Sequence, residues 1–178
     1  MRPITAPARR CTPGPEDNGI EIYRDRPRAE WPRDEDGRVE LYTEPLDLDA
    51  LAADAGGGKG LPVGTDLGHV HLEVTSLEAF GDRYVDTLGF EVHTRWPDAW
   101  FVAAGGYHHH LAANTWNQRT APTRGRGLAW FEVLLPDEAS FEAVRDRLER
   151  SEYAIVETET GIAVTDADEI TVRIRVDS

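Results

Sequence analysis

The sequence contains a single cysteine, Cys11, among its 178 residues. An intramolecular disulfide is therefore excluded, and this sparing use of cysteine is typical of the cytoplasm. Long apolar segments are missing too, because no run approaches the roughly 18 residues that a membrane-spanning helix needs. We therefore expect a cytoplasmic protein with no membrane partner.

Basic side chains are also scarce. The chain has 19 lysines and arginines against 33 aspartates and glutamates, which gives a formal net charge of -14. A field of that sign opposes binding to nucleic acid and to anionic lipid surfaces. The glycine-rich stretch Gly56–Gly60 lacks the Lys-Ser or Lys-Thr pair of a phosphate-binding loop. Nucleic acid is therefore excluded as an expected partner.

What the sequence does contain is a strongly patterned stretch, Leu67–Val74. Its residues alternate, with His69, His71 and Glu73 on one face and apolar residues on the other, which is typical of a half-buried strand. Two histidines at positions i and i+2 point the same way, and neutral imidazole is a common metal ligand. A metal site and a hydrogen-bonded polar wall are both open interpretations of this pattern.

A helix and three more strands follow this stretch. Ser76 is a candidate N-cap for apolar residues spaced at the helical period up to Leu88, and Gly89 suits the left-handed position after a helix. The three runs that come next have the composition of strands separated by Pro-Asp and Gly-Gly turns, and they cover residues 90–96, 99–104 and 107–112. The pattern predicts a βαβββ module.

The same order of elements occurs a second time. The starts Gly68-His69 and Gly127-Leu128 lie 59 positions apart (127 minus 68). The second copy consists of a strand at 128–135, a helix starting at Pro136-Asp137 with Phe141, Val144 and Leu148 on one face, and strands at 153–157, 162–166 and 170–176. The sequence therefore predicts an α+β fold with two tandem βαβββ modules, which together form a domain over residues 61–178.

The first 60 residues fit neither module. Residues 1–15 are rich in proline, alanine and arginine, and we expect them to be disordered or adventitious. Residues 16–60 supply a strand at Gly19–Arg24, with Glu21 and Tyr23 on one face, and then a connector with a short strand at Val39–Thr43, a short helix at Leu46–Ala53 and a glycine-rich linker. The first strand is isolated. Because an unpaired edge invites another chain, a homodimer through this strand is expected.

Three segments carry a resemblance to a known family. They are Gly-His-Val-His-Leu-Glu-Val at 68–74, Tyr-Val-Asp-Thr-Leu-Gly-Phe at 84–90 and Ala-Ala-Gly-Gly-Tyr-His-His-His-Leu-Ala-Ala-Asn-Thr-Trp at 103–116. Over residues 16–176 the chain resembles the vicinal oxygen chelate superfamily of glyoxalases, bleomycin resistance proteins and extradiol dioxygenases. The most similar pattern is the second half of ring-cleaving proteins of the catechol 2,3-dioxygenase type. This resemblance implies a curved mixed sheet around a divalent metal, and an Fe(II)-dependent oxidoreductase acting on a small aromatic molecule.

The resemblance also implies ligand positions, where two histidines and a glutamate hold Fe(II). Glu21 matches the glutamate ligand of the first half, whose two histidines would lie before Met1. In the second half, His69 matches the first histidine position, whereas Trp130 and Arg173 stand where the other two ligands belong. Indole does not ligate Fe(II), and a guanidinium opposes metal binding. We therefore expect a truncated or degenerate dioxygenase with a weakened metal site or with its iron lost.

A second metal site, outside the family pattern, is an alternative. His108 and His110 share one face of the expected strand 107–112, and His109 points to the other. If this strand and Leu67–Val74 line one cavity, His69 or His71 converges with His108 or His110, and Glu132 supplies an oxygen ligand. Such a set suits Fe, Zn, Ni or Mn, so another divalent metal remains open.

Aromatic side chains suggest where a small molecule binds. Trp130, Arg173 and Trp116 are candidates for contact with a planar substrate, with core packing as the ordinary alternative for the tryptophans. Two functions from different classes therefore remain. One is an extradiol ring-cleaving enzyme, and the other is a non-catalytic module of the same fold that binds or sequesters a small molecule.

Overall fold

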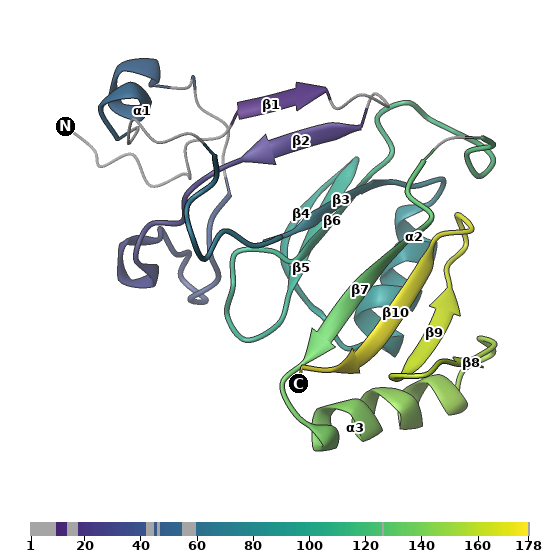
Figure 1. The fold of residues 1–178 in the computed structure, drawn as a ribbon. Helices are drawn as coiled ribbons and strands as arrows, with labels where there is room; N and C mark the ends of the chain where they lie inside the picture. The colour runs from purple at the N-terminus through teal and green to yellow at the C-terminus, as the bar shows by residue number, and fades with distance from the viewer. Residues whose placement is uncertain are drawn as a thin grey trace.

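A computed structural model of the chain describes residues 10–13, 18–41, 45, 47–54, 60–125 and 127–177. Two four-stranded sheets dominate these residues, and a smaller two-stranded sheet lies beside them (Figure 1). Within the described segments, none of the helices has the length and hydropathy needed to cross a membrane.

Both four-stranded sheets have the same topology. The first has the order β3-β6-β5-β4 and the second the order β7-β10-β9-β8. In each sheet the first and last strands of the module pair in parallel, and the other pairs are antiparallel. The strands are β3 (Val70–Glu73), β4 (Glu91–Trp96), β5 (Ala99–Ala103), β6 (Leu111–Asn114), β7 (Trp130–Leu135), β8 (Val156–Glu157), β9 (Ile162–Thr165) and β10 (Thr171–Val176). The matching order confirms the two βαβββ modules.

The helix of the first module begins as its sequence predicts. The Ser76 hydroxyl accepts a hydrogen bond from the Ala79 amide at 3.2 Å, and α2 (Leu77–Phe80) starts there. The helix then widens into a π-helix, η2 (Gly81–Thr87), where the Leu88 amide donates to the carbonyl five residues earlier. Gly89 follows with φ +88°, the left-handed conformation expected after the helix.

The helix of the second module, α3 (Glu138–Glu149), also starts at its predicted cap. The Asp137 carboxylate accepts from the Ser140 amide at 2.8 Å. Phe141, Val144 and Leu148 are buried on one face, as their spacing predicts.

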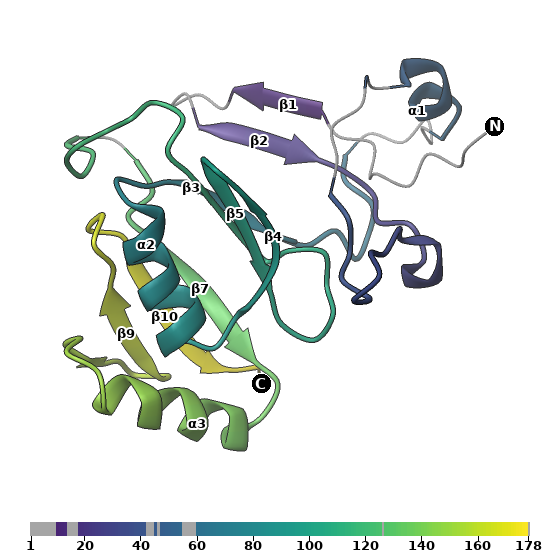
Figure 2. The same ribbon diagram turned by 180° about the vertical axis from the view of Figure 1, so that it is seen from behind.

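The two modules share one core. In Figure 2 the first module's helix lies in front of the second sheet, and Tyr84 of η2 stacks with Phe131 of β7 at a centroid distance of 6.3 Å. The apolar cluster combines residues of both modules, among them Leu72, Tyr84, Phe131, Leu148 and Val172. Polar contacts tie the same surfaces together. The Tyr84 hydroxyl donates to Asp166 Oδ2 at 2.8 Å. The fold is therefore one unit built from two copies, and not two independent modules.

Arg147 of α3 makes the second tie. Its Nε and Nη2 donate to the carbonyls of Thr87 and Leu88, both at 2.9 Å. These carbonyls lie at the end of the first module's helix, where the backbone acceptors have no partner within the helix. A side chain of one module thus satisfies the helix end of the other.

The strand expected at residues 19–24 is β2 (Gly19–Ile22), and it lies apart from the main sheets. It is nevertheless paired, because β1 (Arg10–Pro13) runs antiparallel to it with Cys11 opposite Glu21. Residues 10–13 belong to the segment expected to be disordered, and their sequence carries no strand alternation. One edge of this strand therefore has a partner within the chain, and a homodimer through the strand stays a prediction.

The connector folds over the first sheet. It contains a short 3-10 helix, η1 (Arg28–Glu30), a bridge between Arg33 and Val39 in place of the expected strand 39–43, and α1 (Leu48–Asp54) near the helix expected at 46–53. Residues 42–44 and the linker glycines 56–58 lie outside the described residues. Leu41 packs against Ala99, Phe101 and Ala112. Phe101 alternates with core residue Val102 along β5, so the connector covers the sheet face opposite the shared core.

Candidate metal centre

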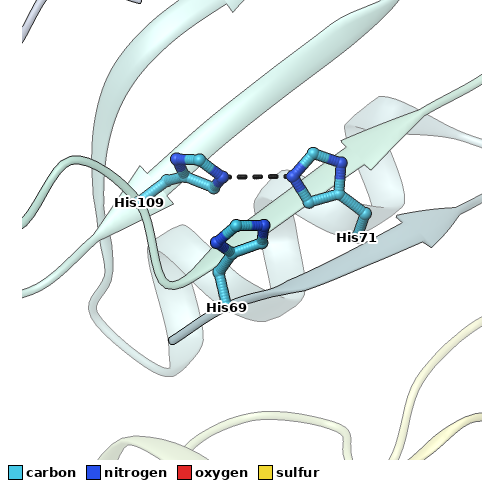
Figure 3. A group of neighbouring side chains, drawn as sticks. All are labelled: His69, His71 and His109. Carbon is cyan, nitrogen blue, oxygen red and sulfur yellow. Dashed lines mark hydrogen bonds between the residues drawn. The ribbon is translucent and has the colours of Figure 1, made fainter. Parts of the chain in front are cut away.

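Three histidines meet where β3 and β6 begin (Figure 3). His69 and His71 stand two positions apart on the β3 segment, and their ring centroids are 4.8 Å apart. His109 precedes β6, the parallel neighbour of β3, so its ring lies beside both, with centroids 4.4 Å from His69 and 5.2 Å from His71. Sheet pairing thus brings together residues some 40 positions apart.

The separations between their nitrogens suit a metal ion. One ligand nitrogen of each histidine lies within 4.8 Å of the other two, and His71 Nε2 is 3.1 Å from His109 Nε2. Two nitrogens about 2.1 Å from an ion are about 3.0 Å apart when adjacent at a right angle, and about 4.2 Å apart when opposite. The His71–His109 pair already has the spacing of adjacent ligands, and separations of up to 4.8 Å in the set have to shorten before all three nitrogens bind one ion.

Burial differs across the three. His109 is fully buried and the His69 side chain is 5% exposed, whereas His71 is exposed. Imidazole sets of this kind fit Fe(II), Zn, Ni and Cu. Because one side of the cluster faces solvent, an ion there has room for a further ligand.

A carboxylate joins the histidines. Glu21 Oε2 lies 3.0 Å from His69 Nε2, which is also the spacing of two adjacent ligands on one ion. Tyr23 holds the other nitrogen of His69, with its hydroxyl 3.0 Å from Nδ1 and its ring stacked at 4.9 Å. Both ring nitrogens of His69 therefore have partners, and His69 exchanges one of them when it ligates an ion.

A layer of polar contacts supports His109. Its Nδ1 lies 2.8 Å from Nδ1 of His108, and His108 Nε2 lies 3.0 Å from Asp25 Oδ1. The second oxygen of Asp25 accepts from the Tyr107 hydroxyl at 2.6 Å, and that hydroxyl is 3.2 Å from the hydroxyl of Tyr23. Burial and these hydrogen bonds raise the pKa of Tyr107 far above its ordinary value, so it remains a hydrogen-bond donor.

The N-terminal segment enters the site through alternate residues. Glu21, Tyr23 and Asp25 lie on one face of an extended stretch, and each contacts a histidine. Behind them Trp31, only 8% exposed, packs edge-on against Tyr107 and His108 with centroids 5.6 and 5.3 Å away. The connector therefore forms one wall of the site.

The structure separates the residues that the sequence proposed as ligands. His69 and His71 lie in the cluster, and His108 lies behind it. His110 turns away, with Nδ1 accepting from the Ala104 amide at 3.2 Å and its ring beside Phe90 and Tyr107. Burial lowers the pKa of His110, which favours its neutral form there.

The candidates on the second sheet have other partners. Glu132 forms an ion pair with Arg175 at 3.0 Å. The guanidinium of Arg173 stacks over the Trp130 ring at 3.8 Å, and Trp130 is 46% exposed. Trp116, beyond β6, is 58% exposed. The positions that match family ligands in this half thus carry an exposed cation–π pair.

His109 was placed on the wrong face by the sequence pattern. Alternation was assumed over 107–112, but β6 begins only at Leu111. Gly105 and Gly106 have φ +61° and +69°, and the chain bends before the strand, so neighbouring His108 and His109 contact each other. The Gly-Gly pair was the available signal. The contacts of Tyr23, Asp25 and Trp31 span from 46 to 84 positions and had no local signal.

The chain is similar to known proteins both in sequence and in fold. Residues 66–174 match the model of the glyoxalase/bleomycin resistance protein/dioxygenase superfamily. A catechol-2,3-dioxygenase of Bacillus subtilis (strain 168) is 40% identical over an alignment of 159 residues, and the match covers 85% of this chain and 56% of that protein. The chain thus spans little more than half the length of this relative.

Solved structures have the same fold at low identity. A glyoxalase/dioxygenase from Nostoc punctiforme gives a TM-score of 0.53 at 14% identity and covers 69% of this chain and 99% of its own. A lactoylglutathione lyase from Agrobacterium tumefaciens gives 0.50 at 17% identity, with coverage of 65% and 96%. These similarities concern the fold alone.

Proposed function

Because the chain belongs to the glyoxalase/bleomycin resistance protein/dioxygenase superfamily, we propose that it is a catechol 2,3-dioxygenase-like protein, an extradiol ring-cleaving oxidoreductase. The observation that carries the proposal is the convergence of His69, His71 and His109. These three imidazoles, with Glu21 beside His69, would hold a divalent ion, for which Fe(II) is the choice that fits both the donors and the similarity to a catechol-2,3-dioxygenase.

The bound ion would supply a Lewis acid with open positions for a catechol and for dioxygen. The chain's own residues orient its ligands and shape the space around them. Tyr23 and Glu21 fix the ring of His69. Phe101 presents an apolar surface to His71 and His109, with centroids 6.1 and 5.3 Å away. A small aromatic molecule therefore enters from the exposed side at His71.

This ligand set differs from the family pattern. Trp130 and Arg173, at the positions matching two family ligands, stack on one another on the second sheet. An ion would therefore be held by residues of the first module and its N-terminal segment, with three neutral imidazoles and the Glu21 carboxylate beside His69.

Anaerobic loading with Fe(II) tests the proposal. We expect about one iron per chain by elemental analysis, with catechol cleavage followed through the absorbance of the ring-opened product. His109→Ala removes both, whereas His110→Ala keeps both because His110 lies outside the cluster. Failure of the unmodified chain to retain iron contradicts the proposal.

A second function is favoured by one observation, the exposed Trp130–Arg173 pair. An indole and a guanidinium stacked at a surface can bind a planar molecule without metal. As a non-catalytic binding module, the metal-free chain would quench its tryptophan fluorescence on adding catechol. Trp130→Ala would abolish that signal and His109→Ala would leave it.

A further inference from the structure

We propose that Asp25 is a positioning residue of the metal centre, acting through His108 to fix the tautomer of His109. The inference rests on the proposed metal site and concerns how that site is prepared before an ion arrives. The Asp25 carboxylate lies against His108 and Tyr107, and two consecutive hydrogen bonds connect it to His109.

The first link determines the proton on His108. An ionised carboxylate can only accept hydrogen bonds, so the 3.0 Å contact with Asp25 Oδ1 requires a proton on His108 Nε2. The other carboxylate oxygen is held at 2.6 Å by the Tyr107 hydroxyl. Both oxygens are therefore engaged, and the carboxylate cannot rotate away from His108 without losing the Tyr107 bond.

The second hydrogen bond, between His108 and His109, then determines the tautomer of His109. A neutral His108 protonated at Nε2 has its lone pair at Nδ1, so the proton in the 2.8 Å contact belongs to His109 Nδ1. Its Nε2 then carries a lone pair, directed at His71 Nε2 3.1 Å away. A ring nitrogen must be unprotonated to bind a metal, and this is the nitrogen that faces the cluster (Figure 3).

Burial makes the arrangement selective. His109 is fully buried and His108 is 3% exposed. The opposite tautomer would set two ring N–H groups or two lone pairs face to face, and solvent does not reach them to compensate. A carboxylate oriented behind a ligand histidine commonly raises metal affinity in this way, and here one further histidine transmits the effect.

Asp25 also connects the two sides of the site. Tyr107, which donates to Asp25, lies 3.2 Å from the Tyr23 hydroxyl, and Tyr23 in turn holds His69. Removing the carboxylate therefore frees Tyr107 and weakens the support of both His109 and His69. This predicts a larger effect for Asp25→Ala than for Tyr107→Phe, which leaves the His108 contact in place.

The tautomer is measured on the metal-free chain by long-range ¹H–¹⁵N correlation, with His109 identified by the signals lost in His109→Gln. We expect His109 protonated at Nδ1 in the unmodified chain and a mixture of tautomers in Asp25→Ala. Asp25→Asn keeps an oxygen acceptor for His108 and so keeps the tautomer. Asp36→Asn is the matched control, since Asp36 is an exposed carboxylate nearby in the chain that pairs with Arg38.

Metal affinity is measured with Co²⁺, followed by its visible absorption. Asp25→Ala should weaken binding by about 10- to 100-fold, as expected for loss of a carboxylate behind a ligand histidine. Asp25→Asn should lose less Co²⁺ affinity than Asp25→Ala, and Asp36→Asn should lose none. Circular dichroism checks folding, and Asp25→Asn keeps the comparison usable if the alanine variant is unstable.

Different outcomes separate this inference from the function it rests on. If the unmodified chain binds Co²⁺ and Asp25→Ala changes neither the tautomer nor the affinity, the positioning role is wrong and the metal centre stands. If His109 is protonated at Nε2 in the unmodified chain, the role is likewise wrong. If Co²⁺ does not bind the unmodified chain at all, the metal centre is wrong, and the role of Asp25 toward it is wrong as well.

Discussion

Glu21 Oε2 lies 3.0 Å from His69 Nε2, although 48 positions separate the two residues. The family resemblance assigned them to ligand positions of two different halves, and the structure makes them neighbours. The carboxylate arrives through β2 and the extended stretch after it, and Glu21 is only 20% exposed beside a His69 that is 5% exposed. With Glu21, the candidate centre consists of three neutral imidazoles and one negatively charged carboxylate.

Glu21→Gln should therefore weaken metal binding without abolishing it. The amide keeps the shape of the side chain and loses the charge that attracts a cation, and we expect about a 10-fold loss of Co²⁺ affinity, in the range for residues adjoining a ligand. The measurement is the Co²⁺ titration described above. Unchanged affinity would mean that Glu21 only orients His69.

His109→Ala and His110→Ala form a matched pair of neighbours. The first removes a nitrogen of the cluster and should lower metal affinity by at least about 100-fold, beyond the loss usual for a supporting residue. The second removes an acceptor for the Ala104 amide and should cost stability but not metal. Parallel titrations and thermal melts distinguish the two, and equal metal loss in both would place the site elsewhere.

Gly68→Ala should damage the site through packing. A Cβ at this position would overlap the Tyr23 hydroxyl and approach the Tyr107 hydroxyl at 3.3 Å. The expected cost is about 1–3 kcal/mol of unfolding free energy, with weaker metal binding because Tyr23 moves away from His69. Urea denaturation measures the free energy of unfolding, and the Co²⁺ titration measures metal binding.

Gly127→Ala is the control for that substitution, because no atom lies within 4 Å of the Cβ it would add and its φ is not positive. Gly127→Ala should change neither the free energy of unfolding nor the metal affinity. A Gly68→Ala chain as stable and as competent in metal binding as the control would show that Tyr23 adapts freely.

Arg147→Ala should destabilise the whole domain. It removes two hydrogen bonds from a cation to the carbonyls of Thr87 and Leu88 and leaves the first module's helix end uncapped. We expect a loss of about 2 kcal/mol in a single cooperative urea transition. Arg147→Lys retains the charge but cannot make both hydrogen bonds. Its free energy of unfolding should therefore lie between those of the unmodified chain and Arg147→Ala. Two separate transitions in either variant would contradict the shared core.

His93 should make stability depend on pH. Burial lowers its pKa in the folded chain below the ordinary 6.5, and its Nδ1 is buried without a hydrogen-bond partner among the described residues. The unfolded chain therefore binds the proton more readily, so stability is lost as pH falls from 6.5 through the lower pKa of folded His93. His93→Leu should flatten this part of the profile. Urea denaturation at pH 7.5 and 5.5 measures it, and an unchanged slope would assign the dependence to other groups.

Local pattern was enough for most of the fold. Phe141, Val144 and Leu148 follow the helical period, and all three are buried. Ser76 and Asp137 cap their helices as their residue types predict, and Gly89 takes the conformation its position requires. The repeat then predicted two βαβββ modules, and the structure has them with the same strand order in both sheets.

The site depends on information that local pattern does not contain. His69 and His71 were found because a two-residue period links them. His109 was misplaced because the chain bends at Gly105 and Gly106 before its strand begins. Asp25 was not singled out by the sequence, since its partner His108 is 83 positions away and nothing near Asp25 signals the contact.

The hydrogen bonds from Arg147 to the first module's helix end have a consequence for inheritance. If one ancestral unit was copied to produce the present pair, the first copy has since become dependent on the second, because Arg147 supplies the donors that the end of the first copy's helix lacks. A recombination event that exchanged one copy would separate the carbonyls of Thr87 and Leu88 from their donor. Crossovers are better tolerated at the edges of the pair, and insertions in the exposed connection around Asn117 and Gln118 between the copies. Selection would therefore act on the pair as a single heritable unit.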